Sequence, residues 1–343
     1  MRRVGLVLIG LGLSGLALPA FGVELVLGAR EVDWMPILGL VVLCLGVLAT
    51  WEGQRGVRAV ALTDPRAWRR FKKNRGAVAG GVLVIAVMTV GFVGPMLAPH
   101  PPDDIFDAGL TEDGTPVGPN DLFVLGADNI GRDELSRLLY GGRVSLSVAL
   151  TAVAIAGLLG FGAGLVSGYF KGALDLSLMA IVDFVLSLPF LLIAIALNRV
   201  IENPALWTLC LLLGLLSWTT LARVTRAKTL QVRELEYVHA ARALGATHLR
   251  ILLRHVLPNV LGPAIVIGST MIANMIIVES AMSFLGLGVK PPTASWGSML
   301  RDGQEYLQYA PRLILYPGAL IVMTVFGFNL LGEGLRDALD PKE

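Results

Sequence analysis

The residues best suited to chemistry in this chain are three histidines inside a polar, basic segment at 233–259. Imidazole side chains bind metal ions and transfer protons near neutral pH. His239, His248 and His255 are well separated, and neither a cysteine nor a close histidine pair completes a metal site beside them. We therefore predict that these histidines serve a protein interface and that the chain holds no metal ion.

The sequence also lacks the common signatures of catalysis. It contains no GxxxxGK[ST] phosphate loop, no HExxH motif and no GxSxG motif. Gly10, Gly12 and Gly15 spell GxGxxG, but their apolar surroundings predict close helix packing and not a dinucleotide site. Cys44 and Cys210 lie in apolar runs and predict no disulfide. We expect no enzymatic activity and no cofactor; if ATP drives the process, another polypeptide must hydrolyse it.

The composition predicts a polytopic, all-α membrane protein. Of 343 residues, 55% are hydrophobic and only 16% are charged, and the mean hydropathy is +0.70. A soluble domain cannot bury so much apolar surface. A cleaved signal peptide is the alternative for the first run, which is longer than an ordinary signal and is followed by a second run. We predict eight spans, at 4–28, 35–51, 76–98, 144–170, 174–197, 207–222, 261–285 and 313–331.

The distribution of basic residues predicts the orientation of these spans. Lys and Arg crowd the segments 52–76 and 222–259, whereas the intervening loops on the other side carry few. Short loops rich in Lys and Arg stay on the cytoplasmic side. With an even number of spans, both termini are expected in the cytoplasm.

Small residues in the fourth span predict a close helix contact. Gly160, Gly164 and Gly168 recur every four residues, which places them on one helix face where another helix can approach. Lys171 and Gly172 then predict a tight turn on the cytoplasmic side.

The fifth span contains polar residues that need partners. Asp175 and Asp183 fall roughly on one helix face, and an ionised carboxylate in a bilayer is costly unless it is paired. We favour pairing with an arginine or a backbone amide over the alternative, a proton relay. Pro189 predicts a kink in this span.

Two segments are predicted to lie on the outer side. The segment 99–140 is rich in Pro, Asp and Gly and reads as a loop, with Leu135, Leu138 and Leu139 forming a short interfacial helix at its end. The segment 286–311 is predicted to be a second outer loop.

The basic segment at 233–259 has the pattern of a helix, a glycine turn and a second helix. Its first half, 232–244, is rich in Glu, Arg, Ala and Leu, which favour helix. Gly245 is expected at positive φ, Thr247 to cap a second helix that runs to about Val256, and Pro258 to end it. Such a projection from a membrane domain predicts a protein-docking device.

This segment resembles the "EAA" loop of ABC importer permeases, in the form found in C-type subunits of the dipeptide, oligopeptide and nickel group. His239 stands where the general motif has Glu, and His255 replaces the usual Ile. The resemblance covers roughly four fifths of the chain, from about Trp68, and includes the stretch 126–143, Trp296 and Arg336. The residues that carry it in the basic segment are Glu236, Tyr237, Val238, Ala240, Ala241, Arg242, Gly245, Arg250, Ile251 and the run RHVLPN at 254–259.

The resemblance implies an organisation. We expect an extra transmembrane helix pair at 1–51, a basic cytoplasmic linker at 52–76, and a six-helix permease domain at 77–343 with a cytoplasmic coupling loop at 223–259. It also implies that the outer loop contacts a substrate-binding protein through Asp128, Arg132 and Asp133. Contact with the ATPase is implied for Glu236, Tyr237, Ala240, Ala241, Arg242, Gly245, Arg250, Arg254, Leu257 and Pro258.

The implied partners are two ABC ATPase subunits, a homologous second permease, an extracytoplasmic substrate-binding protein and the lipid bilayer of a prokaryotic inner membrane, with no nucleic acid. The solute transported by the family can be a dipeptide, an oligopeptide, a nickel complex or another small polar molecule. The alternative function is a secondary transporter that works alone. That alternative needs ionisable residues near the bilayer midplane, for which Asp183 gives little support.

Overall fold

The computed structural model describes residues 65–200 and 206–339, and within them every regular element is helical. The all-α prediction is confirmed. The two predicted spans at 4–28 and 35–51, and most of the basic linker, lie outside the described residues. The helices are α3 (Pro65–Lys73), α4 (Arg75–Phe92), α5 (Glu134–Phe170), α6 (Gly172–Ser187), α7 (Phe190–Val200), α8 (Leu206–Arg233), α9 (Glu236–Ala243), α10 (His248–Ile251), α11 (Leu257–Phe284), α12 (Trp296–Gly303) and α13 (Arg312–Leu339).

Five of the described helices are long and apolar enough to cross a membrane, judged by length and composition. They are α4, α5, α8, the continuous helix His248–Phe284 that contains α10 and α11, and α13. The predicted fifth span is divided into α6 and α7 at Pro189. Leu188 is extended, with φ −82° and ψ 134°, because the proline ring disfavours a helical residue before it. Pro189 therefore breaks the helix, where only a kink was predicted.

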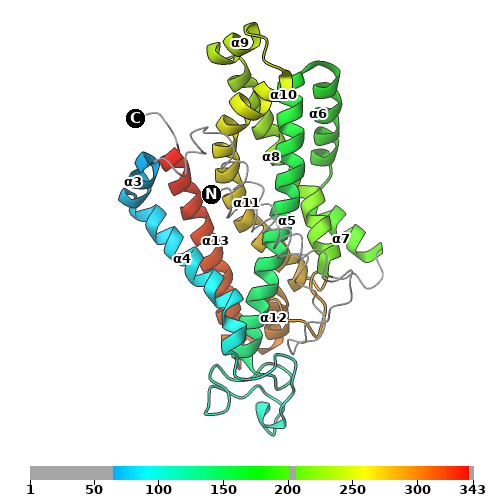
Figure 1. Ribbon diagram of the computed structural model, residues 1–343. Helices are drawn as coiled ribbons and strands as arrows, with labels where there is room; N and C mark the ends of the chain where they lie inside the picture. The colour runs from blue at the N-terminus through cyan, green and yellow to red at the C-terminus, as the bar shows by residue number, and fades with distance from the viewer. Residues whose placement is uncertain (1–64, 201–205, 340–343) are drawn as a thin grey trace, which may run out of the picture.

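The helices form an elongated bundle with two different ends (Figure 1). We call the end that carries α3, α9, α10 and the α5–α6 turn the basic end, and the opposite end, with residues 94–133 and α12, the loop end. At the basic end, Asn74 caps α4 and donates a hydrogen bond of 2.9 Å to Asp337 of α13. The segments predicted on the cytoplasmic side, at 171–172 and 222–259, lie at the basic end, and those predicted on the outer side, at 99–140 and 286–311, lie at the loop end (Figure 1).

The contact between α5 and α8 depends on missing side chains. Gly160, Gly164 and Gly168 face α8, and a Cβ atom on Gly164 would lie 2.4 Å from the carbonyl oxygen of Ala222. Gly162 on the same helix has no atom within 4 Å of that position. The predicted small-residue face is confirmed, and the backbones of α5 and α8 are close because of it.

The predicted interfacial helix is not a separate element. Residues 135–139 belong to the first turns of α5, which begins at Glu134. The carboxylate of the preceding residue, Asp133, caps the helix by accepting a hydrogen bond from the backbone N–H of Ser136. α5 continues through Gly142, where a Cβ atom would lie 2.8 Å from the ring of Trp296. The glycine makes room for a buried aromatic side chain, which sequence spacing alone does not reveal.

The predicted outer loop at 286–311 contains the helix α12. Ser295 and Ser298 form a reciprocal cap at its start. Trp296 is fully buried and donates from Nε1 to the carbonyl oxygen of Leu138 at 3.1 Å. The element is therefore packed into the core beside α5 and α11, and the loop prediction is corrected over these residues.

Candidate functional site

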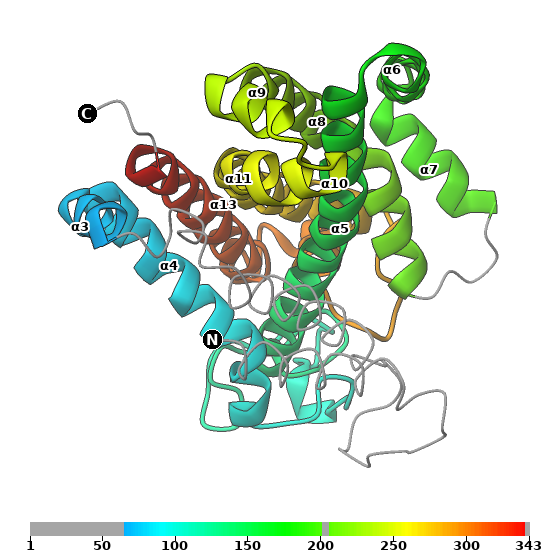
Figure 2. The ribbon, with the colours of Figure 1, turned by 45° about the horizontal axis from the view of Figure 1, so that its top comes forward.

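The basic hairpin, residues 233–259, projects from the basic end of the bundle beside the ends of α5 and α8 (Figures 1 and 2). Its first helix begins at Glu236, later than predicted, because α8 continues to Arg233 and Leu235 is extended at ψ 144°. Gly245 has φ +78°, as expected for a residue that ends a helix. Thr247 caps α10 by accepting from the backbone N–H of Arg250 at 3.4 Å.

Pro258 does not end the second helix, contrary to the prediction. α10 passes through a π-helical turn, Leu252–Val256, into α11. The backbone N–H of Leu257 bonds to the carbonyl oxygen of Leu252, which is the wide spacing of a π turn. Proline lacks an N–H and clashes with the carbonyl four residues earlier in an α-helix. A widened turn directly before Pro258 accommodates it, so the helix continues from His248 to Phe284.

The hairpin has a core of its own at the basic end. Val238 of α9 and Ile251 of α10 are fully buried. They pack in one cluster with Leu165 and Tyr169 of α5 and with Val232 of α8. Apolar burial of this kind anchors the hairpin to the bundle. A force applied to the hairpin therefore acts on α5 and α8 as well.

The opposite face of the hairpin is exposed and mixes apolar with basic side chains. Leu244 is 88% exposed and Leu249 65% exposed, which is unusual for leucines that project beyond the apolar part of the bundle. Of the predicted coupling residues, Ala241, Arg242, Leu257 and Pro258 are half-buried, and Glu236, Tyr237, Ala240, Gly245, Arg250 and Arg254 are exposed. The structure thus brings all ten to this end of the molecule.

Hydrogen bonds fix α9 against the start of α11. The side-chain amide of Asn259 donates to the Tyr237 hydroxyl at 3.1 Å and to the carbonyl oxygen of His255 at 2.7 Å. Partial burial raises the pKa of Tyr237. Sequence reasoning placed Asn259 only within the family motif, whereas the structure gives it a positioning role.

Charged groups tie the hairpin to the α5–α6 turn. Lys171, at positive φ as the predicted tight turn requires, donates from Nζ to Glu234 at 2.7 Å. This ammonium lowers the pKa of the Glu234 carboxyl. His239 lies 3.4 Å from the same carboxylate, and His248 is bonded to Tyr169 at 3.1 Å. No group of three potential metal ligands exists among the described residues.

Two ion pairs connect α6 to α8 just inside the basic end. Arg226 binds Asp175 with two nitrogens, at 2.6 Å and 2.7 Å. Arg223 binds Asp183 at 2.6 Å, with both side chains more than half exposed. The predicted pairing of these aspartates with arginines is confirmed.

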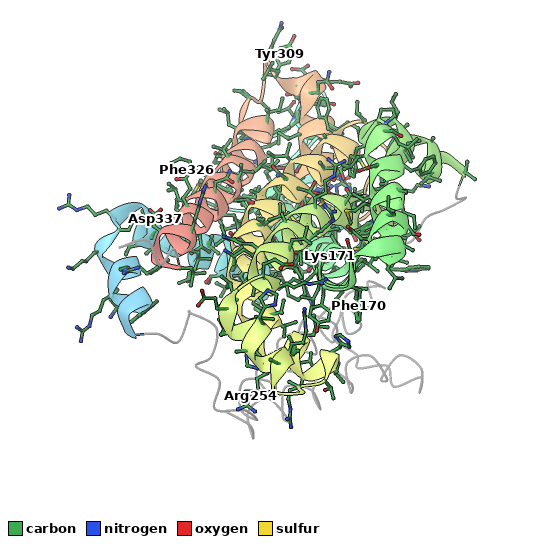
Figure 3. All side chains as sticks on the ribbon, turned by 90° about the horizontal axis from the view of Figure 1, so that it is seen from above. Phe170, Lys171, Arg254, Tyr309, Phe326 and Asp337 are labelled. Carbon is green, nitrogen blue, oxygen red and sulfur yellow. The ribbon has the colours of Figure 1, made fainter. Side chains whose placement is uncertain are left out.

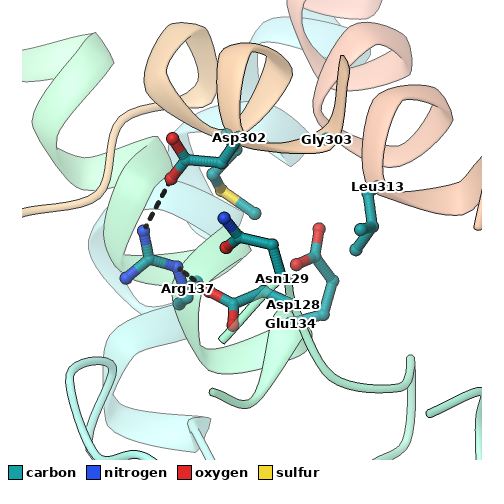
Figure 4. Close-up of a pocket in the computed structure, with 8 residues that line it drawn as sticks. Asp128, Asn129, Glu134, Arg137, Asp302, Gly303 and Leu313 are labelled. Carbon is teal, nitrogen blue, oxygen red and sulfur yellow. Dashed lines mark ion pairs between the residues drawn. The ribbon is translucent and has the colours of Figure 1, made fainter. Parts of the chain in front are cut away.

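A second polar cluster occupies the loop end (Figure 4). Asp128 accepts hydrogen bonds from Arg132 at 2.7 Å and lies 3.1 Å from Arg137, which also pairs with Asp302 of α12 at 3.7 Å. Asp128, Arg132 and Asp133 are 4%, 6% and 0% exposed. In this chain they hold the outer loop against α5 and α12. Their predicted contact with a binding protein stays a prediction, and Arg137 and Asp302 are partners that sequence reasoning missed.

Comparison with known proteins gives the family. The family described as "Binding-protein-dependent transport system inner membrane component" matches residues 160–343, more than half of the chain. The chain belongs to this family. A second description, "N-terminal TM domain of oligopeptide transport permease C", matches residues 66–112. The first match contains the basic hairpin, and the second contains all of α4 and all but the first residue of α3.

Relatives in this permease family align over most of the chain. The glutathione transport system permease protein GsiD of Pectobacterium atrosepticum is 37% identical over 80% of this chain and 90% of its own. The dipeptide transport system permease protein DppC of Bacillus subtilis is 39% identical over 80% and 85%. The di/tripeptide permease DppC of Pseudomonas aeruginosa is 37% identical over 80% and 91%. The predicted resemblance to ABC importer permeases is confirmed, and the chain is a multi-pass inner-membrane transport component.

Proposed function

We propose that this permease forms half of the translocation pathway of an ATP-driven peptide importer and that its basic hairpin docks onto a separate ATPase subunit. The observation that carries the proposal is the exposed face of the hairpin. Leu244 and Leu249 there are exposed beyond the apolar bundle, beside the exposed cations of Arg250 and Arg254. An apolar centre with basic neighbours is the composition of a surface that binds an acidic, partly apolar cleft.

The connections of the hairpin support mechanical coupling. Only two residues, Glu234 and Leu235, separate α8 from α9 of the hairpin. The second helix of the hairpin is continuous with α11, and together they span 37 residues. Closing of two ATPase subunits on ATP would move the hairpin, and these helices would carry the motion across the membrane. Opening toward the outer side would then release the solute, and hydrolysis would restore the inward-facing state.

The proposed assembly contains two ATPase subunits, this permease, a homologous second permease and a substrate-binding protein at the loop end. Names of the relatives include glutathione, dipeptide and di/tripeptide, so we propose a short peptide as the solute. We further propose that both termini and the basic end are cytoplasmic, in line with the Lys and Arg distribution. Asp128, Arg132 and Asp133 act at the loop end by shaping the outer loop that faces the binding protein.

A co-purification experiment tests the docking step. Tagged permease is isolated from gently solubilised membranes of its own cell, and accompanying ATPases are identified by mass spectrometry. Leu244→Asp places a charge at the centre of the proposed contact. It is expected to lower the amount of ATPase that co-purifies at least ten-fold, which corresponds to a loss of about 1.4 kcal/mol of binding free energy. Ile105→Asp is the matched control, because Ile105 is also exposed, at 63%, but lies at the loop end.

Retention of the ATPase by Leu244→Asp at the level of wild type would refute docking through this face. A wild-type permease that purifies with no ATPase would instead favour a transporter that works alone. Equal loss in both variants would indicate a general defect in assembly and would also count against the assigned face.

A further inference from the structure

A cleft at the basic end is lined by five residues, of which only Arg242 is among those predicted to contact the ATPase. It has a volume of about 170 Å³ and is formed by Tyr169, Phe170, Arg233, Arg242 and His248. These residues come from the end of α5, the end of α8, α9 and the start of α10. A water molecule occupies about 30 Å³ in the liquid. The cleft therefore has the volume of several water molecules, which is enough room for a phosphate group.

The arginines in this cleft have unused donors. The side chain of Arg242 forms no hydrogen bond or ion pair within the described part of the chain, and its Nε atom is buried without a partner. Arg233 donates to the carbonyl oxygen of Tyr169. Its buried Nε has no hydrogen bond and lies 3.7 Å from Glu234. A buried guanidinium N–H without an acceptor costs free energy, which a bound anion would recover.

The other groups around the cleft favour an anion as well. Tyr169 and His248 are hydrogen-bonded at 3.1 Å; when Tyr169 donates, the second nitrogen of His248 carries a proton and is a further donor. Glu234 is the carboxylate paired with Arg233, and Lys171 and His239 already bind it. The cations of Arg233, Arg242 and Lys171 therefore exceed the single negative charge beside them.

The position of the cleft along the bundle indicates the source of such an anion. Phe170, which is 47% exposed, ends the 37-residue apolar helix α5, and Leu174 on α6 is 54% exposed just beyond the turn. Figure 3 shows Phe170 and Lys171 at the end of the bundle from which the hairpin projects. Apolar side chains that give way to cations within one turn mark the level of lipid head groups.

We propose that this cleft binds a phosphate group, presented by an anionic phospholipid or by a small phosphorylated solute. The planar guanidinium of Arg242 would bind two phosphate oxygens, as arginine does in phosphate sites generally. Arg233 and His248 would complete the set of donors. The bound group would link α5, α8 and the hairpin, and so stabilise their arrangement.

The test measures the thermal unfolding midpoint of the purified full-length chain in a neutral detergent. It is titrated separately with inorganic phosphate, with phosphatidylglycerol and with zwitterionic phosphatidylcholine. We expect a saturable rise with phosphatidylglycerol, with inorganic phosphate or with both. A response to the lipid alone assigns the head group as the source, and a response to phosphate alone assigns a soluble ligand.

Variants connect the response to the cleft. Arg242→Gln is expected to raise the half-saturating concentration about ten-fold or more, the effect of losing one charged hydrogen-bonding group. Arg254→Gln removes the same charge from an exposed site that projects outward from the hairpin, and is expected to leave the response unchanged (Figure 3). Arg242→Lys keeps the charge but loses the paired donors, and is expected to weaken binding less than Arg242→Gln.

Two results would overturn the phosphate site. The first is a wild-type midpoint that neither anion changes, which is also expected if Arg242 pairs with an ATPase carboxylate instead. The second is equal weakening in Arg242→Gln and Arg254→Gln, which would indicate nonspecific attraction to a basic surface. If Arg242→Gln does not fold, Arg242→Lys is compared with Arg254→Gln in its place. The assay needs no transport activity, so its outcome is independent of the coupling proposed above.

Discussion

A single added methyl group at Gly164 should push α5 and α8 apart, whereas the same change at Gly162 should not. A Cβ at Gly164 would lie 2.4 Å from the carbonyl oxygen of Ala222 and 2.7 Å from the Cβ of Thr225. Ordinary contacts of a Cβ begin at 3.4 Å, so the helices must separate by about 1 Å. At Gly162 nothing lies within 4 Å, and the methyl group fits freely.

Comparing Gly164→Ala with Gly162→Ala isolates the free-energy cost of the closer packing between α5 and α8. Both Gly→Ala changes gain the same helix propensity, about 1 kcal/mol, which cancels between the two variants. What remains is the cost of overpacking a close contact, about 1–3 kcal/mol. Gly164→Ala is therefore expected to be less stable than Gly162→Ala by that amount.

The assay is reversible unfolding of the purified permease in mixed micelles with a rising fraction of dodecyl sulfate, followed by circular dichroism. Each variant is compared with wild type in the same detergent batch. Equal unfolding free energies for Gly164→Ala and Gly162→Ala would refute the claim that the glycine face sets the distance between α5 and α8.

Two further predictions concern the hairpin and the ion pairs. Gly245→Val is expected to abolish uptake of the proposed peptide solute without affecting membrane insertion, because φ is +78° and a β-branched residue there costs about 1 kcal/mol or more. Gly245→Asn should retain uptake, since asparagine tolerates this conformation, and normal uptake in the valine variant would contradict the role. Arg226→Gln should lower the unfolding free energy by about 1.5–3 kcal/mol, because it removes the bidentate pair of hydrogen bonds to the Asp175 carboxylate. Arg223→Gln should lower it by about 1 kcal/mol or less, because that pair with Asp183 is exposed; equal losses in the unfolding assay would argue against this distinction.

Features that depend on neighbours in sequence were predictable. The glycines at 160, 164 and 168 lie on one face because a helix repeats every 3.6 residues. The positive φ of Gly245 and the cap by Thr247 follow from the residue types that such positions require. Family motifs then placed the candidate coupling residues at one end, although their contact with an ATPase stays a prediction.

Features that depend on distant partners were not predictable. Arg137 looked like a residue of an interfacial helix, yet it is 2% exposed because Asp128 and Asp302 neutralise it from two other segments. Asp128 was predicted to contact a binding protein from the outer loop, yet it is 4% exposed and lies against Arg132 and Arg137. Trp296 lay in a predicted loop, but a pocket beside Gly142 receives its ring and anchors α12. Long-range burial decided each of these cases.

The π turn at Leu252–Val256 sets the rotational phase between the hairpin and α11. Each residue of an α-helix advances about 100° around the axis, and a π turn holds about one residue more than an α turn. Conversion of this turn to α spacing, with no residue removed, would turn the whole hairpin by roughly that angle relative to α11. The direction in which Leu244 points thus depends on the hydrogen-bond spacing of a single turn, and the proline that follows keeps that turn wide.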